Sequence, residues 1–251
     1  FNWSPHPELL QSYPQAYINM GITAENVANE YKISRIQQEE FALKSHHKSF
    51  VAQTENKFNE EIIPIVSKNH TVTKDGCIRS NSSLEMMSKL EPAFIENGTV
   101  TAATSSPLTD GVVFALICSE DFCEKNSLKP IGRIISGSVS GCKPELMGLG
   151  PINSTNSLMQ RLNWDNSDID VFELNEAFAS QSIACIDELK LDYEKVNIDG
   201  GAISIGHPLG ASGARIACKA ASILNRIGGS RALASMCIGG GMGISIAIEN
   251  V

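Results

Sequence analysis

Three short segments of this 251-residue chain carry the residue types that acid–base chemistry needs. Each offers, beside a predicted strand, a side chain that can orient a ligand oxygen (an amide) or move a proton (an imidazole or a thiol). In open α/β sheets, sites are usually built where strands meet loops or helices. The segments are residues 175–179 (NEAFA), 200–213 (GGAISIGHPLGASG) and 237–243 (CIGGGMG).

The middle segment places His207 in a loop with five glycines among fourteen residues. Glycine lets backbone approach a ligand or another backbone closely, and Pro208 stiffens the turn after the histidine. The loop is not a Walker A motif, because His207-Pro208 stands where Lys-Ser/Thr is required, and it is not a GxGxxG fingerprint. His207 is therefore either a structural histidine or an acid–base group, and glycine-rich loops preferentially carry sites.

The two flanking segments also allow two interpretations each. Asn175 precedes a predicted helix, so it is either the N-cap of that helix or a fixed amide that orients a water or a ligand oxygen. Cys237 is either a small buried apolar side chain or a reactive thiol. The four glycines closely following Cys237 favour the second interpretation, because they free backbone N–H groups to face a developing negative charge.

Composition narrows the class of protein. A formal net charge of −8 argues against nucleic acid as the main partner, and no run of eighteen apolar residues suggests a membrane span. The seven cysteines include no CxxC pair, so we expect neither a disulfide framework nor a metal site. A reducing, cytoplasmic location is the simpler expectation. The chain starts at Phe1 without an initiator Met, so we expect that residues are missing upstream, and organelle targeting cannot be judged.

The pattern changes at about residue 108, from helical and irregular structure to alternating strands and helices. Capping boxes of Ser34 with Gln37 and of Ser82 with Glu85 predict two helix starts in the first part. The run 112–118 (VVFALIC) is typical of a strand buried on both faces. The alternation predicts an α/β structure with a mainly parallel sheet. Further strands are expected at residues 131–139, 171–174, 196–198, 232–237 and 244–248, and helices around 158–162 and at 176–189 and 212–226.

The three segments, in this order, resemble those of the thiolases, which act on acyl-CoA thioesters. Three more stretches are similar to that family, namely residues 17–28 (YINMGITAENVA), 98–111 (GTVTAATSSPLTDG) and 147–151 (MGLGP). The resemblance implies the α/β thiolase fold, a five-layered αβαβα architecture of two similar halves. It predicts a loop domain at 1–108, the last strand of the N-terminal half at 109–120 and the C-terminal domain at 121–251.

The resemblance also implies an activity and a set of catalytic residues. Thiolases cleave 3-ketoacyl-CoA to acetyl-CoA and a shortened acyl-CoA, or run the reverse Claisen condensation. By motif match, His207 is the base that activates a nucleophilic Cys and helps bind the thioester oxygen, and Asn175 holds a water in the same oxyanion hole. Cys237 moves a proton at the α-carbon, for which an ordinary thiol pKa of about 8.5 is expected. Gly239 supplies a backbone N–H to a second oxyanion hole.

Coenzyme A is implied as a substrate, with no resident cofactor. Arg79 would meet its nucleotide end, where a guanidinium suits stacking or phosphate. A homodimer or homotetramer is implied for the full-length protein. The positions that match the family's CoA and substrate contacts are Met20, Arg79, Phe94, Ala102, Ser106, Ala177 and Phe178.

The main departure from the family is the nucleophile. Thiolases carry it in a Cys-(Gly/Ala/Ser)-Ser-Gly setting upstream of the loop domain, and no such setting occurs in this sequence. Cys118 and Cys142 are the nearest cysteine contexts, and both lie in the wrong region and lack the motif. These residues alone are therefore expected to be inactive, and a non-catalytic CoA-binding or structural remnant is the alternative function.

Smaller departures bear on the subtype. Ala103-Thr104, Leu174 and Asn19 differ from residues frequent in acetoacetyl-CoA or biosynthetic thiolases, which favours the degradative 3-ketoacyl-CoA type and β-oxidation. A 3-ketoacyl-ACP synthase-like enzyme is opposed by the segment at 237–241 and by the loop domain. A sterol-carrier-type thiolase would have His-Asp-Cys-Phe where residues 175–178 read NEAF.

Overall fold

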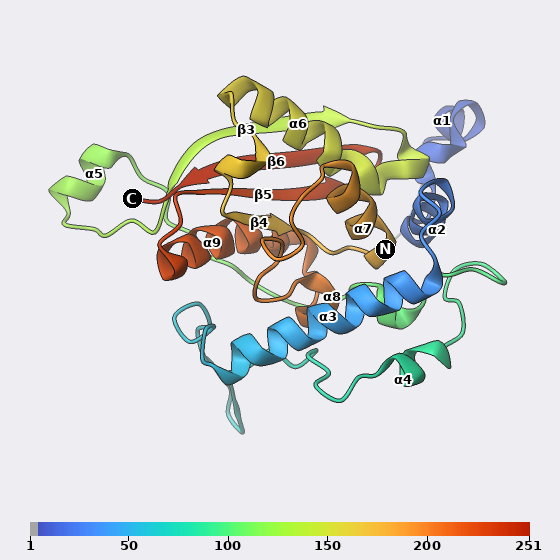
Figure 1. The fold of residues 1–251 in the computed structure, drawn as a ribbon, viewed down its shortest axis with the longest axis horizontal. Coiled ribbons are helices and arrows are strands. Elements are labelled where there is room, and N and C mark those ends of the chain that lie inside the picture. The colour runs from blue at the N-terminus through green and yellow to red at the C-terminus, as the bar shows by residue number, and fades with distance from the viewer. Residues whose placement is uncertain (1–4) are drawn as a thin grey trace.

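The computed structural model describes residues 5–251, which form a four-stranded sheet between helices and a region of helices and loops beside it (Figure 1). The strands are β3 (Arg133–Gly141), β4 (Val171–Leu174), β5 (Arg231–Ile238) and β6 (Met242–Glu249). Their order in the sheet is β3-β6-β5-β4. Strands 131–139, 171–174, 232–237 and 244–248 are thus confirmed, with small shifts at their ends.

The predicted mainly parallel sheet is wrong. Only β4 and β5 are parallel, whereas β5–β6 and β6–β3 are antiparallel. The glycine turn after Cys237 folds β6 directly back along β5, because Gly240 and Gly241 adopt φ values of 88° and 93° that suit glycine. The parallel pair is instead joined by a long crossover that contains helices, as parallel strands require.

Helices cover both faces of the sheet (Figure 1). Side chains alternate along the strands, so Phe172 packs with α6 (Gly150–Leu162) and α7 (Ala179–Glu188), and Val171 packs with α9 (Leu209–Ile227). Helix α7 begins at Ala179, three residues later than predicted. The result is a three-layered α/β/α unit, which agrees with the predicted thiolase fold but contains one sheet of the five-layered architecture.

Helix α3 (Arg35–Thr54) connects the first part of the chain to this unit. The predicted capping box of Ser34 and Gln37 starts it, and it lies against α7 and α8 (Ala202–Ile205). At the second predicted start the cap is Ser83 rather than Ser82, and it precedes α4 (Leu84–Ser88). The other elements are α1 (Pro7–Ser12), α2 (Met20–Glu30), α5 (Glu120–Lys125), the hairpin of β1 (Ile65–Val66) and β2 (Thr71–Val72), and the 3-10 helices η1 (Pro14–Tyr17), η2 (Ala102–Thr104), η3 (Pro144–Leu149) and η4 (Asn166–Asp168).

The strand predicted at 112–118, within the segment 109–120, is not present. These residues form no ladder with any strand of the described chain, and Phe114 is 87% exposed. An apolar run becomes a strand only when a neighbouring strand accepts and donates its backbone hydrogen bonds. The predicted strand at 196–198 is likewise reduced to one parallel bridge between Phe172 and Val196. The division at residues 108 and 120 remains a prediction, and residues 1–4 of the first domain lie outside the described residues.

None of the helices within residues 5–251 combines the length and the apolar character that a membrane crossing requires.

Candidate active site

The parallel pair β4–β5 brings two of the three sequence segments together. Leu174 is in register with Ser235, and the backbone N–H of Asn175 donates to the Ser235 carbonyl at 2.9 Å. Cys237 lies two residues further along β5. Because parallel strands end at the same edge of a sheet, Asn175 and Cys237 occupy neighbouring positions there.

The glycine-rich segment places His207 at this edge. Gly206, with φ 100°, ends α8, and the His207 N–H donates to the Pro107 carbonyl at 3.2 Å. The imidazole Nε2 lies 3.4 Å from Asn175 Nδ2, and Nδ1 lies 2.6 Å from Ser212 Oγ. Burial, followed by the positive charge of Arg215, lowers the pKa of His207. The imidazole is therefore neutral at physiological pH and can accept a proton.

Asn175 is a fixed amide and not an N-cap. The N-cap of α7 is Phe178, three residues later, so that alternative is wrong. The Asn175 side chain is fully buried, and its Oδ1 has no hydrogen-bond partner within the described protein. A buried amide oxygen without a partner is costly, so it is suited to a water or ligand group that donates a hydrogen bond.

Cys237 is buried in a small apolar cluster at the end of β5. The cluster contains Ala177, Phe178 and Met147. Burial raises the pKa of the Cys237 thiol to about 12, so the expected value of about 8.5 is wrong. At neutral pH Cys237 is a protonated thiol, which makes it a proton donor before it can be an acceptor. The backbone at Gly239 is close to Met20, because a Cβ there would lie 3.9 Å from the Met20 sulfur.

Several predicted CoA-contacting residues surround this cluster. The backbone N–H of Ser106 donates to the Ala177 carbonyl at 3.0 Å. The rings of Phe94 and Phe178 meet edge to face, with centroids 5.9 Å apart. Met20, Phe94 and Ser106 therefore adjoin the Cys237 segment or the NEAFA segment, and two more of the seven predicted positions, Ala177 and Phe178, belong to the NEAFA segment itself. Ala102 lies in η2, three residues before the Ser105–Phe178 bridge, and its side chain is exposed.

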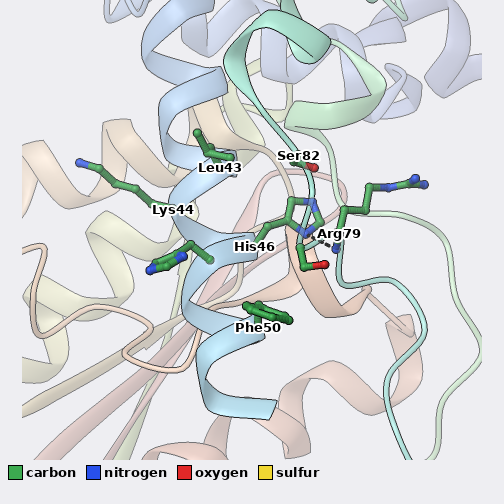
Figure 2. A pocket seen from close by; sticks show the side chains of 8 residues that line it. Leu43, Lys44, His46, Phe50, Arg79 and Ser82 are labelled. Carbon is green, nitrogen blue, oxygen red and sulfur yellow. Dashed lines mark hydrogen bonds between the residues drawn. The ribbon is translucent and has the colours of Figure 1, made fainter. Parts of the chain in front are cut away.

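Arg79 lies apart from these residues, beside α3. Its backbone N–H donates to His46 Nδ1 at 3.2 Å, and Figure 2 shows its side chain extending away from that helix. Burial, followed by the charge of Arg79, lowers the pKa of His46 to about 4. The residues line a cavity of about 340 Å³, whose walls are Leu43, Lys44, His46, His47, Phe50, Arg79, Ser80 and Ser82.

Sequence analysis missed Glu176, which is fully buried beside Asn175. Its carboxylate accepts hydrogen bonds from Ser45 Oγ at 2.6 Å, Asn197 Nδ2 at 2.8 Å and the Ile203 N–H at 3.2 Å. Ser45 belongs to α3, and Ile203 lies in α8 just before His207. Glu176 thus ties together three segments that hold the site. The only sequence signal was its place next to Asn175, since its partners are distant in the chain.

Within residues 5–251, no group of three or more His, Cys, Asp or Glu side chains is arranged to hold a metal ion.

A sheet whose parallel strand ends present a buried asparagine and cysteine, with a histidine on a glycine-rich loop, is the arrangement that the thiolase resemblance implies. The family model for the thiolase C-terminal domain matches residues 128–250, and that for the thiolase N-terminal domain matches residues 7–121. The chain therefore belongs to the thiolase family. The segment we expected to be a loop domain and a strand falls within the family's N-terminal domain.

Similar proteins and structures support this family assignment. The acetyl-CoA acetyltransferase of Shinella zoogloeoides is 44% identical over 237 residues, which are 93% of this chain and 60% of that protein. The cytosolic acetyl-CoA acetyltransferase of Rattus norvegicus is 44% identical over 237 residues, 92% of this chain and 60% of that protein. The structure of human mitochondrial 3-ketoacyl-CoA thiolase in complex with CoA is similar with a TM-score of 0.87 and 38% identity, covering 93% of this chain and 59% of that one. The chain thus spans about 60% of its curated relatives' length.

Proposed function

We propose that these residues supply the acid–base and oxyanion-binding part of a thiolase active site, which transfers acyl groups to and from coenzyme A. The observation that carries the proposal is the 3.4 Å contact between Asn175 and His207 at the sheet edge where Cys237 lies near the end of β5. An amide, a neutral imidazole and a protonated thiol there provide the acid–base and oxyanion-binding groups that carbon–carbon bond cleavage next to a thioester needs, but not the nucleophile.

His207 acts as the base in this proposal. A neutral imidazole takes the proton of a cysteine thiol, and the resulting thiolate attacks the 3-keto carbon of the substrate. The imidazolium then donates to the thioester oxygen, beside a water held by Asn175. The unpartnered Oδ1 of Asn175 supports the water, because that oxygen needs a donor.

Cys237 moves the proton at the α-carbon. When the carbon–carbon bond breaks, the acetyl-CoA fragment leaves as an enolate and must take up one proton. The pKa of about 12, which burial gives the Cys237 thiol, keeps this proton in place until the basic carbon forms. The N–H of Gly239 stabilises the second oxyanion in this proposal, held by the glycine turn between β5 and β6.

Coenzyme A itself is the proposed ligand, with no resident cofactor. Met20, Phe94, Ser106 and Phe178 would contact its pantetheine arm and the acyl group, as their place around Cys237 supports. Arg79, with the cationic and aromatic walls of the cavity in Figure 2, would meet the nucleotide end. Ala102 and Ala177 complete the proposed contacts. The human relative noted above was solved with CoA.

The nucleophile does not come from a recognised motif in these residues. None of the seven cysteines lies in a Cys-(Gly/Ala/Ser)-Ser-Gly setting, so we propose that these 251 residues alone are inactive. The same observation favours the second candidate function, a non-catalytic CoA-binding or structural protein. Degradative cleavage in β-oxidation, a homodimer or homotetramer and a cytoplasmic location remain proposals, and relatives of cytosolic and of mitochondrial origin are both known.

Restoring the uncovered part of a relative tests the proposal. An extended protein combines this chain with the part of the Shinella zoogloeoides enzyme that it does not cover, and acetoacetyl-CoA thiolysis is measured. His207→Ala and Cys237→Ala should each lower kcat by about 100- to 10,000-fold, and Asn175→Ala should lower it less. Cys237→Ser should also fail, since a hydroxyl is a much weaker acid than a thiol. Full activity of Cys237→Ser would assign Cys237 a packing role instead.

A further inference from the structure

The two ring nitrogens of His207 have different neighbours. Nδ1 lies 2.6 Å from the hydroxyl oxygen of Ser212, in the first turn of α9. Nε2 lies 3.4 Å from Asn175 Nδ2. A neutral imidazole carries one proton, so one nitrogen donates and the other accepts, and the neighbours decide which.

The hydroxyl proton of Ser212 has another acceptor. Ser212 Oγ donates to the Pro208 carbonyl at 3.1 Å, one helical turn earlier. A hydroxyl has a single proton, so while Ser212 makes this bond its oxygen can only accept from His207. The amide N–H of Asn175 on the other side is a donor, which requires an acceptor at Nε2. Both neighbours therefore favour a proton on Nδ1 and a bare Nε2.

We propose that Ser212 is a positioning residue for the proposed acyl-transfer reaction, which holds His207 in the Nδ1–H tautomer so that Nε2 is the basic nitrogen. Ser212 has no exposed surface, and its backbone N–H also bonds to the Pro208 carbonyl at 2.9 Å. The hydroxyl is thus fixed by the start of α9 and cannot follow the imidazole if the ring turns.

This tautomer lets one nitrogen perform both proposed roles of His207. Nε2 first accepts the proton of the cysteine thiol, and the same Nε2–H then faces the thioester oxygen as a donor. In the other tautomer the only basic nitrogen would be Nδ1, which faces Ser212 and not Asn175. The proton would then have to leave by a buried path. The use of Nε2 in both roles rests on the proposed function. The tautomer does not, because it is a property of the chain itself.

Nitrogen-15 NMR of the histidine rings in the 251-residue chain measures the tautomer directly. The His207 signals are assigned by their loss in His207→Gln, and the chain contains four other histidines for comparison. At a pH where the ring is neutral, we expect Nδ1 to be protonated and Nε2 to be bare. Ser212→Ala should shift the tautomer ratio toward Nε2–H by about two- to tenfold, as loss of one ordinary hydrogen bond predicts. Ser212→Thr, which keeps the hydroxyl, should restore the wild-type ratio.

The control variant is Ser222→Ala, which removes a hydroxyl from the same helix where it bonds to Glu61 and should leave the ratio unchanged. Wild-type His207 with its proton on Nε2 would overturn the proposal, even if Ser212→Ala failed to fold. An unchanged ratio in folded Ser212→Ala would overturn it too. In the extended protein, Ser212→Ala should lower kcat more than it raises KM, with recovery in Ser212→Thr. An Nδ1–H tautomer in an extended protein without thiolysis would refute the proposed function and leave the role of Ser212 intact.

Discussion

Residues 171–186 and residues 109–119 are both rich in apolar side chains, yet the structure buries every residue of the first segment and none of the second. The first begins with β4, which pairs with β5 and lies between α9 on one face and α6 and α7 on the other. The second has the apolar run 112–118 but no neighbouring strand within residues 5–251. Apolar composition therefore permits a buried strand, and only a partner for its backbone produces one.

The largest expected effect is a difference in the free energy of unfolding between a substitution in the buried sheet and one in the exposed segment. Leu233→Ala removes a buried side chain from the centre of β5, so we expect the free energy of unfolding to fall by about 2–5 kcal/mol. Phe114→Ala removes a larger side chain that is 87% exposed, and we expect a change within about 0.5 kcal/mol. Urea denaturation of both variants makes the comparison. A large loss in Phe114→Ala would show that the segment packs against something in solution.

The next prediction concerns the buried polar tie at Glu176. Glu176→Gln replaces an acceptor that has three donors with an amide whose NH₂ cannot accept, so at least one buried donor loses its partner. We expect a loss of about 1–3 kcal/mol in the free energy of unfolding. Glu188→Gln makes the same exchange at an exposed residue, the last of α7, so it is the control and should change stability little. Equal effects in both variants would remove Glu176 from its proposed place in the site.

Of two adjacent histidines on α3, His46 is buried and His47 is exposed, and His46 should make the free energy of unfolding depend on pH. Burial lowers the pKa of His46 to about 4, below its unfolded value of about 6.5. The unfolded chain therefore binds more protons between these values, and His46 contributes stability above pH 6.5 that is lost as the pH falls toward 4. We expect this contribution to be roughly 2 kcal/mol.

The variant His46→Gln isolates that contribution. Glutamine can still accept from the Arg79 N–H but does not titrate, so the difference in unfolding free energy between it and the wild type should vary with pH only between about 4 and 6.5. His47, the next residue on α3, is exposed, so His47→Gln is the matched control and should change the free energy of unfolding little. Identical pH profiles of wild type and His46→Gln would contradict the low pKa of His46.

The smallest expected effect is on ligand binding at an exposed residue. Calorimetric titration of CoA into the 251-residue chain should show weak binding, and Arg79→Ala should weaken it by up to about tenfold, the scale of one charged hydrogen bond. Lys190→Ala removes an exposed positive charge far along the chain and is the control. Absence of binding at millimolar CoA would refute CoA binding by the chain. Equal affinity in Arg79→Ala would refute the role of Arg79 alone.

Local signals in the sequence predicted much of this structure. The capping box of Ser34 and Gln37 and the strands β4, β5 and β6 depend on residues close in the chain. The motif segments also identified Asn175 and His207, which the structure brings into contact. The family's order of segments, rather than any spacing rule, made that pairing predictable.

Contacts between residues far apart in the chain could not be predicted from the sequence. Glu176 bonds to Ser45, which is 131 residues away, and no local pattern announces such a pair. The pKa of Cys237 depends on burial by side chains from several segments, so a thiol of ordinary pKa was the wrong expectation. The predictions of a mainly parallel sheet and of a strand at 112–118 were also wrong, because each depended on which strands pair with each other. In each case the residue types indicated the kind of structure or chemistry, but the residues that make the contact lie far away in the sequence.

The central proposal is that these residues hold the acid–base part of a thiolase site and not its nucleophile. It is tested most directly by assaying acetoacetyl-CoA thiolysis, with free CoA as acceptor, by the folded 251-residue chain beside the extended protein. We predict turnover in the extended protein, its loss in His207→Ala, and none by the chain alone. Turnover by the chain alone at ordinary enzyme rates, about 1–1000 per second, would contradict the proposal and make one of its own seven cysteines the nucleophile.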